Sequence, residues 1–284
     1  MSNSRKYAIL GESLKHTMSP PIHKRLFELK GREFEYDILE IKPEELEANA
    51  DYLKSLNGFN ITIPHKIGII KYCDELAESA RRYNSVNCVD NKNGKHTGCN
   101  TDCDGFLRTV RAMNVNFGGR VLLIGCGGVG RMMAIEAALA GADLNIAVLE
   151  SDMPLAVQVE KEIKAMKSDA KVTIVLNTKI NTSVKYDLLM NACPVGMYPK
   201  VDGCPVPDEV IAASEAVFDV IYNPRETKLM KKAKAMGKPA VGGMAMLVWQ
   251  AVSAHEIWDG DTYTDEEVQG IIDEMEILVE KDFK

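Results

Sequence analysis

The sequence predicts an α/β protein of two domains, each with a mostly parallel sheet covered by helices. Two observations carry this prediction. Short strand-like runs alternate with amphipathic helical segments along most of the 284 residues, as in parallel sheets that are covered on both faces. A glycine-rich turn at 125–130 also follows a short apolar run and opens a helical segment, as at the start of a doubly wound nucleotide-binding domain.

The first hundred residues supply the elements of the N-terminal domain. We expect strands at 7–11, 34–39, 60–63 and 85–90, and helices at 20–31, 42–56 and 68–83. The helix at 20–31 has proline near its start and glycine at its end, where these residues are favoured. The run at 60–63 alternates polar and apolar residues like a half-buried strand, and it should end at Pro64, which lacks an amide hydrogen.

The elements of the second domain begin near Gly118. Strands are expected at 121–125, 144–149, 172–176, 187–192 and 217–222, and helices directly after the first strand and at 154–166. Two further helical segments, at 244–258 and 266–283, have no strand to serve there. We therefore expect one domain of residues 1–103, completed by helices from 244–284, and a Rossmann-like domain of residues 104–243.

Composition narrows the class of function. The formal net charge of −7 disfavours nucleic acid as the main partner. No stretch approaches the roughly 18 apolar residues of a membrane span, and the N-terminus lacks the apolar region of a signal peptide. The seven cysteines are scattered without a C-x-x-C pair or zinc spacing. We expect reduced thiols, a cytoplasmic location and no metal site.

The glycine-rich turn has the context of a dinucleotide site. Gly125, Gly127 and Gly130 allow a tight turn, close approach of a pyrophosphate, and close helix–strand packing. Glu150 lies twenty positions beyond Gly130, where a carboxylate accepts hydrogen bonds from ribose hydroxyls and repels a 2′-phosphate. Because residues 150–152 contain no cation, we expect NAD to be favoured over NADP. The alternative reading of Asp152 is that it caps the following helix.

Polar strings follow several of the expected strands. In the first half, HTMSP at 16–20, NITIPHK at 60–66, VNC at 86–88 and NTD at 100–102 resemble, in this order, the H-S-x-S-P, N-V-T-x-P-x-K, V-N-T and N-T-D signatures of the shikimate dehydrogenase family. Any one string alone is better explained by helix capping or turn formation.

The second half continues the resemblance. The glycine-rich turn is followed by N-A-x-P-x-G-M at 191–197, D-x-x-Y-N-P at 219–224 and M-L-V-x-Q at 246–250. The match to the family therefore extends over nearly the whole chain. It implies a substrate-binding and catalytic first domain and an NAD(P)-binding second domain.

The resemblance implies reversible hydride transfer between NAD(P) and the C3 hydroxyl of shikimate, a cyclohexene polyol carboxylate. It implies that Lys66 and Asp102 are the catalytic acid–base pair. Thr17 and Ser19 would donate hydrogen bonds to the substrate carboxylate. Thr62, Asn87 and Gln250 would bind the ring hydroxyls, and Tyr222 would complete the substrate pocket. The cofactor-binding residues would be Gly125, Gly127, Gly128, Val129, Gly130, Glu150, Asn191, Val220 and Met246.

The chemistry of these residue types agrees with the resemblance. A substrate with one carboxylate and several hydroxyls suits neutral side chains that both donate and accept hydrogen bonds. Hydride transfer also needs proton movement at the alcohol oxygen, and a lysine supplies it where no metal set is visible. The carboxylate of Asp102 stabilises the charged lysine, which suits ketone reduction and opposes alcohol oxidation at neutral pH.

The chain departs from the family pattern at several positions. Thr17 replaces a serine and crowds the carboxylate end, so a quinate-like or amino-substituted acid is an alternative substrate. Asn84, Ser85, Cys88 and Ala245 replace a glycine, an alanine, a threonine and a glycine. NADP-dependent members carry Asn-Arg-Thr in place of residues 150–152. NAD use fits a catabolic quinate or shikimate dehydrogenase, while a biosynthetic role towards aromatic amino acids is the alternative direction.

Two other classes of function remain open at this point. One is a non-catalytic sensor that binds a dinucleotide and a small acid. Such a sensor would not need Lys66 and Asp102, and the sequence shows no DNA-binding element through which it could regulate a partner. A different oxidoreductase on the same two-domain plan would act on another alcohol. The expected partner is a small-molecule substrate, with no nucleic acid or membrane, and the chain is expected to be a monomer or a homodimer.

Overall fold

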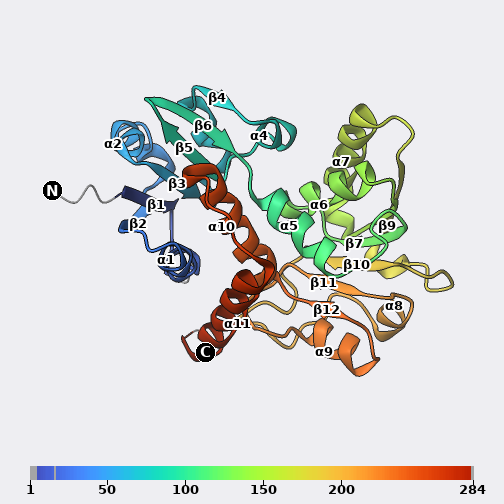
Figure 1. Cartoon of the computed structure of the whole chain (residues 1–284). Helices are drawn as coiled ribbons and strands as arrows, with labels where there is room; N and C mark the ends of the chain where they lie inside the picture. The colour runs from blue at the N-terminus through green and yellow to red at the C-terminus, as the bar shows by residue number, and fades with distance from the viewer. Residues whose placement is uncertain (1–4, 16, 283–284) are drawn as a thin grey trace. The chain divides into compact units, whose positions relative to one another are not determined.

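The computed structural model describes residues 5–15 and 17–282. The chain divides into two compact units. Unit 1 comprises the described residues up to Gly105 together with Leu247–Met275, and unit 2 comprises Phe106–Met246 together with the described residues from Glu276 onward. In the described part of the chain each unit contains one six-stranded sheet (Figure 1). The predicted α/β class with two sheets rich in parallel strands is confirmed.

The sheet of unit 1 is mixed. Its strands lie in the order β2 (Phe34–Glu40), β1 (Arg5–Gly11), β3 (Gly58–Ile61), β5 (Cys88–Lys92), β6 (Lys95–Cys99) and β4 (Glu75–Leu76). β1 pairs in parallel with β2 and β3, and β4 pairs in parallel with β6. β5 is antiparallel to both β3 and β6. The parallel half of this sheet therefore begins the chain, and a hairpin extends it.

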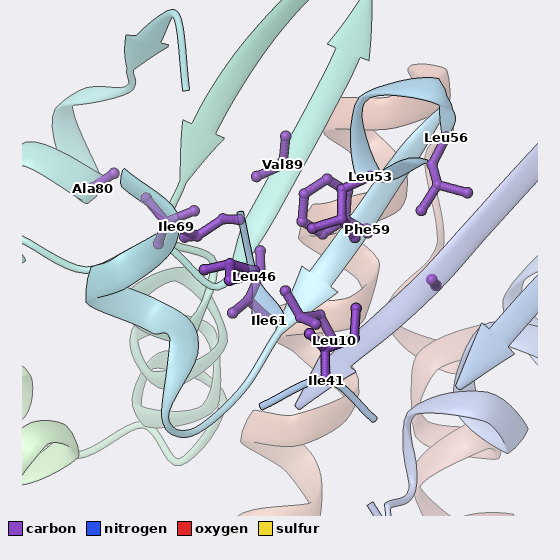
Figure 2. Packing of buried hydrophobic residues seen from close by; sticks show 12 residues of the cluster. Leu10, Ile41, Leu46, Leu53, Leu56, Phe59, Ile61, Ile69, Ala80 and Val89 are labelled. Carbon is purple, nitrogen blue, oxygen red and sulfur yellow. The ribbon is translucent and has the colours of Figure 1, made fainter. Parts of the chain in front are cut away.

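Apolar side chains cover both faces of this sheet. On one face, residues of β1, β3 and β5 pack with Leu46, Leu53 and Ile69 from the short helical segments (Figure 2). On the other face, Tyr7, Phe27 and Trp258 form a second cluster. Phe27 belongs to α1 (Ser19–Leu29), and Trp258 belongs to α10 (Gly243–Asp259), whose residues from Leu247 onward are part of unit 1.

The predicted helix at 68–83 is wrong. This stretch contains the end of α3 (His65–Gly68), a 3₁₀ turn at Ile69–Tyr72, strand β4 and α4 (Glu78–Tyr83). The amides of Asp74 and Ala77 donate to the carbonyls of His96 and Gly98, each at 2.8 Å. These bonds to β6 replace the internal bonds that a continuous helix would need. The predicted helix at 42–56 is likewise divided, into a turn at Pro43–Glu45 and α2 (Ala50–Ser55).

Two strand predictions also need correction. β3 spans Gly58–Ile61 and all four residues are buried, so it is not half-buried. The ladder nevertheless continues for one bond, because the Thr62 amide donates to the Leu10 carbonyl at 2.8 Å. β6 was not predicted, although Asn93 and Gly94 before it have φ of 55° and 74°. An Asn-Gly pair with these angles is the signal of a two-residue hairpin.

Unit 2 has the doubly wound topology that the glycine-rich turn predicts. Its strands are all parallel, in the order β12 (Ala240–Val241), β11 (Val217–Asp219), β10 (Leu188–Asn191), β7 (Arg120–Ile124), β8 (Asp143–Val148) and β9 (Lys171–Leu176). The helices of this unit include α6 (Gly128–Leu139), α7 (Met153–Met166), α8 (Asp208–Ala212) and α9 (Lys228–Ala235). The strand order reverses between β7 and β10, which is the place where such sheets bind ligands.

Two further helices are shared by the units. α5 (Asp102–Ala112) begins in unit 1, and α11 (Asp265–Asp282) extends from unit 1 into unit 2. Across the described residues, no helix combines the length and the apolar character needed to cross a membrane.

Buried histidines join α1, α10 and the segment before α11. His23 Nδ1 lies 3.0 Å from His255 Nε2, and His255 Nδ1 lies 3.1 Å from the Tyr263 hydroxyl. Both rings are fully buried. Burial lowers the pKa of His23, as does the neighbouring His255, and burial together with Arg32 lowers the pKa of His255 to about 3. Both histidines are therefore neutral in the folded chain at neutral pH.

This pair predicts that unit 1 loses stability in mild acid. The unfolded chain binds protons on these histidines below about pH 6.5, while the folded chain binds them only at much lower pH. The contribution of these histidines to the free energy of unfolding is therefore fully present above about pH 6.5 and is lost as the pH drops towards 3. At pH 5.5 the loss should be about 1.4 kcal/mol per histidine. Urea unfolding at pH 7.5 and 5.5 measures it.

The control for this prediction is the variant His96→Gln. His96 lies on β6, outside the pair. The double variant H23Q/H255Q should show a smaller dependence on pH than H96Q, whatever its absolute stability. Equal pH dependence in the two variants would show that the pair does not control acid stability.

Candidate functional site

Lys66 and Asp102 form an ion pair at the edge of the unit 1 sheet. Lys66 lies in α3, directly after the turn that ends β3, and Asp102 is the first residue of α5. Lys66 Nζ lies 2.6 Å from Asp102 Oδ2, and the two side chains are 25% and 20% exposed. The positive end of the α5 dipole stabilises the carboxylate. The amine is therefore held by a fixed anion and still reaches solvent.

Asn87 connects this pair to a buried amide network. Its Nδ2 donates to Asp102 Oδ1 at 2.9 Å and lies 3.0 Å from Thr101 Oγ1 and 3.5 Å from Gln250 Oε1. Its Oδ1 accepts the Thr101 amide at 2.7 Å. Gln250 also donates from Nε2 to the Leu247 carbonyl at 2.9 Å. The structure thus brings together Lys66, Asp102, Asn87 and Gln250 from four separate segments.

The other residues predicted to bind substrate in unit 1 lie at the starts of helices and the end of a strand. Thr17 Oγ1 accepts the Ser19 amide at 3.3 Å, and Ser19 is 8% exposed at the start of α1. Thr62 is half-buried and directly follows β3. His16, the first residue of the HTMSP string, lies outside the described residues.

Two residues that sequence reasoning did not select also belong to this region. Thr101 is fully buried, and its hydroxyl lies 3.3 Å from Gln250 Oε1. Its signal was its place beside Asp102 in the NTD string. The Tyr36 hydroxyl donates to Asn60 Oδ1 at 2.8 Å. Burial raises the pKa of Tyr36 well above its usual value, and a hydrogen bond with Ser19 opposes this rise. A tyrosine in a strand carries no comparable signal.

The region can hold a polar substrate and move a proton. Neutral donors and acceptors surround one ammonium group, which suits an anion that carries hydroxyls. When protonated, Lys66 can donate to a developing alkoxide, and when neutral it can accept a hydroxyl proton.

The glycine-rich turn of unit 2 has the shape of a phosphate cradle. Gly125 has φ of +84°, which favours glycine. A Cβ on Gly130 would lie 2.6 Å from the Gly125 carbonyl oxygen, so this glycine permits close packing. A Cβ on Gly127 or Gly128 would meet no described residue within 4 Å, and Val129 follows on the first turn of α6 with 36% of its surface exposed. An open helix N-terminus of this kind fits a dinucleotide pyrophosphate.

Glu150 lies exposed just beyond the carboxyl end of β8, the strand next to β7. Its neighbour Asp152 occupies the N-cap position of α7, but its side chain makes no capping hydrogen bond. The capping explanation of Asp152 therefore finds no support in the structure. Both carboxylates lie on the side of the glycine turn that is expected to hold a ribose.

The remaining predicted residues belong to unit 2. Asn191 ends β10 and is fully buried, and among the described residues its side-chain amide bonds only to Asp219 and to the backbone of Cys193. Any role of its side chain in cofactor binding is therefore indirect. Val220 and Tyr222 follow β11, where burial raises the pKa of Tyr222. Met246 is 8% exposed on α10.

One group of potential metal ligands occurs among the described residues: His255, Asp259 and Asp261. Each already has protein partners. Both nitrogens of His255 are engaged, Asp261 binds Arg32, and Asp259 accepts from the Tyr7 hydroxyl at 3.0 Å. These three residues therefore have a structural role, because they link β1, α1 and the C-terminal helices.

Comparison with known proteins identifies relatives along the whole chain. A family model described as the shikimate dehydrogenase substrate binding domain matches residues 9–89. The curated shikimate dehydrogenase (NADP(+)) of Caldanaerobacter subterraneus subsp. tengcongensis is 34% identical over 268 residues, which cover 92% of this chain and 94% of the relative.

Solved structures show the same similarity. Shikimate 5-dehydrogenase from Listeria monocytogenes, in complex with shikimate and NAD, is 26% identical with a TM-score of 0.86, covering 96% of this chain and 97% of that one. The ligand-free 5-ketofructose reductase of Gluconobacter sp. strain CHM43 is 29% identical with a TM-score of 0.84, covering 97% of this chain and all of that one.

Proposed function

Because the chain belongs to the shikimate dehydrogenase family, we propose that it transfers a hydride reversibly between NAD(P) and the C3 hydroxyl of shikimate. The predicted family, and with it an oxidoreductase that acts on a CH–OH group, is confirmed. The observation that supports the proposed chemistry is the contact of 2.6 Å between Lys66 Nζ and Asp102 Oδ2, with Asn87 on the other carboxylate oxygen.

In this proposal, the residues of unit 1 hold the substrate and move its proton. Thr17 and Ser19 donate to the carboxylate, and Thr62, Asn87 and Gln250 bind the ring hydroxyls. Lys66 gives a proton to the C3 oxygen during ketone reduction and removes it during alcohol oxidation. Asp102 orients the amine through Oδ2 while Asn87 fixes Oδ1.

The residues of unit 2 fit a dinucleotide, which when bound supplies or accepts the hydride. The open cradle formed by Gly127 and Gly128 would hold the pyrophosphate, with Gly125, Val129 and Gly130 shaping the turn. In the same proposal Glu150 accepts from the adenosine ribose, Val220 and Met246 contribute to cofactor binding, and Tyr222 binds substrate.

We further propose that NAD is preferred over NADP. Glu150 is exposed at the end of β8 and Asp152 follows it, so a 2′-phosphate would face two carboxylates. The curated relative carries NADP(+) in its name, while the Listeria enzyme was solved with NAD. Both cofactors therefore occur among relatives of this chain.

A substrate panel assayed with both cofactors tests the function. We expect turnover of shikimate with NAD at a higher kcat/KM than with NADP, and lower values with quinate. The panel includes 5-ketofructose, because a structural relative is a 5-ketofructose reductase. Turnover of 5-ketofructose without turnover of any cyclohexene carboxylate would replace the proposal with a sugar reductase. Binding of ligands without any turnover would instead support the sensor.

The variant Glu150→Ala tests the cofactor preference. Loss of hydrogen bonds from ribose hydroxyls to a charged acceptor should lower kcat/KM with NAD about tenfold. The value with NADP should stay constant or rise, because the like charge is gone. Asp152→Ala is the matched control, with an expected change below about threefold since its side chain makes no capping bond. A wild-type preference for NADP would contradict the role of Glu150.

The proposal includes a cytoplasmic location, based on the seven cysteines that are all free thiols. It also includes a monomer or a homodimer as the working assembly.

A further inference from the structure

Asp219, the last residue of β11, is a carboxylate that unit 2 buries completely. Its Oδ1 accepts from Asn191 Nδ2 at 2.9 Å and from the Ile221 amide at 3.2 Å. Its Oδ2 accepts from the Thr227 hydroxyl at 2.7 Å. All three donors are neutral, so no cation among the described residues balances the charge.

The partners of Asp219 favour its ionised form. The Asn191 Oδ1 is occupied by the Cys193 amide, and the Thr227 Oγ1 accepts from the Met230 amide. Each partner therefore presents a hydrogen to Asp219, and a protonated carboxyl would set its own hydrogen against one of them. Burial raises the pKa of Asp219, and the three hydrogen bonds oppose that rise.

One carboxylate thus fixes three segments. These are the turn after β10, the turn after β11 and the first turn of α9, whose N-cap is Thr227. The Val220 amide also donates to the Asn191 carbonyl at 3.0 Å, which joins the first two turns directly. Asn191 and Asp219 are partners in register at the carboxyl ends of adjacent parallel strands, and Figure 1 shows β10 and β11 side by side.

The order of strands places the charge of Asp219 in one half of the proposed dinucleotide site. The glycine turn follows β7, and Glu150 follows β8 on one side of it. β10 and β11 lie on the other side of β7. A dinucleotide that crosses a doubly wound sheet at its switch point puts one mononucleotide on each side. If the adenosine ribose lies at Glu150, the nicotinamide half lies over the ends of β10 and β11.

We propose that Asp219 is a positioning residue that fixes the turns beneath the nicotinamide half and favours the oxidised, cationic ring over the reduced, neutral ring. The inference rests on the proposed function, because it needs NAD(P) binding by unit 2. Uncompensated charge in a poorly polarisable interior acts over several ångströms. A carboxylate with a purely structural role would affect the binding of the oxidised and the reduced cofactor equally.

The test compares the Kd of NAD⁺ with the Kd of NADH on the full chain by titration calorimetry. The variant Asp219→Asn keeps the size of the side chain and removes its charge. We expect it to weaken NAD⁺ binding about tenfold more than NADH binding. The matched control is Thr227→Val, which removes the hydroxyl with its hydrogen bonds to Asp219 and the Met230 amide and keeps the charge of Asp219. It should weaken both forms to a similar degree, so that the ratio of the two Kd values is unchanged.

The inference is overturned if D219N leaves the ratio of Kd values as in the wild type, or if T227V shifts it equally. A measurement on the wild type alone covers the case in which D219N does not fold. The unmodified chain should bind oxidised nicotinamide mononucleotide more tightly than the reduced form, and equal affinities would overturn the inference. If the wild type binds neither NAD⁺ nor NADP⁺, the proposed function itself fails, whereas binding without discrimination removes only the role of Asp219.

Discussion

The variant Lys66→Ala should lower kcat by about a thousandfold while the affinity for shikimate falls much less. Acid–base groups positioned at the reacting atom typically contribute 10²–10⁴ in rate, which sets the order of magnitude of about 10³. Lys66 is the cation paired with Asp102 at the end of β3, and the neutral residues beside it supply binding without it. Steady-state kinetics gives kcat, and calorimetric titration with shikimate gives the affinity.

Lys71→Ala is the control for this variant. Lys71 lies in the neighbouring 3₁₀ turn and is exposed, so its loss removes the same charge from the same region without touching Asp102. We expect its kcat to remain within about twofold of the wild type. If K66A kept wild-type turnover, Lys66 would have no part in proton transfer. If it lost shikimate affinity in proportion to kcat, its role would be binding.

The variant Trp258→Ala should destabilise unit 1 by about 3–5 kcal/mol, the usual cost of removing a buried large aromatic side chain. Trp258 is 3% exposed, and its ring centroid lies 4.8 Å from that of Tyr7. It packs over Gly58, where a Cβ would collide with the indole. Urea unfolding at pH 7.5, where the buried histidines contribute fully, measures the loss.

Trp258→Phe separates packing from hydrogen bonding. The indole Nε1 donates to the Val89 carbonyl at 2.9 Å, and phenylalanine keeps most of the packing while leaving that buried carbonyl without this donor. The expected loss is about 1–3 kcal/mol. A loss in W258A no larger than that in W258F would mean that the ring contributes little beyond its hydrogen bond.

Local sequence patterns predicted the fold class because the strongest signals here are local. The apolar run of β7, the glycine turn and the start of α6 are adjacent in the chain, so their meaning does not depend on distant partners. The helix predicted at 68–83 was wrong for the opposite reason. Its helical spacing competes with hydrogen bonds to β6, and those bonds exist only once the hairpin of β5 and β6 has formed.

The same distinction applies to the candidate site. The family resemblance carried by the polar strings predicted Lys66, Asp102, Asn87 and Gln250 as functional residues, and the structure brings them into one hydrogen-bonded group. Tyr36 was not predicted, because a tyrosine in a strand gains a role only from the partners across the sheet. Asn191 was predicted as a cofactor residue from a motif that does not reveal whether its amide points outward or, as here, into a buried network.

The hairpin of β5 and β6 has a consequence for how the site tolerates change. Asn87 stands just before β5, while Thr101 and Asp102 stand just after β6, and the Asn87 amide donates to the Cys99 carbonyl at 3.0 Å. The chain therefore leaves the site, turns at Asn93 and Gly94, and returns to where it started. Such an excursion can grow or shrink by matched pairs of residues without moving its two ends. The reacting groups therefore lie at the root of this hairpin, at the opposite end from its turn at Asn93 and Gly94.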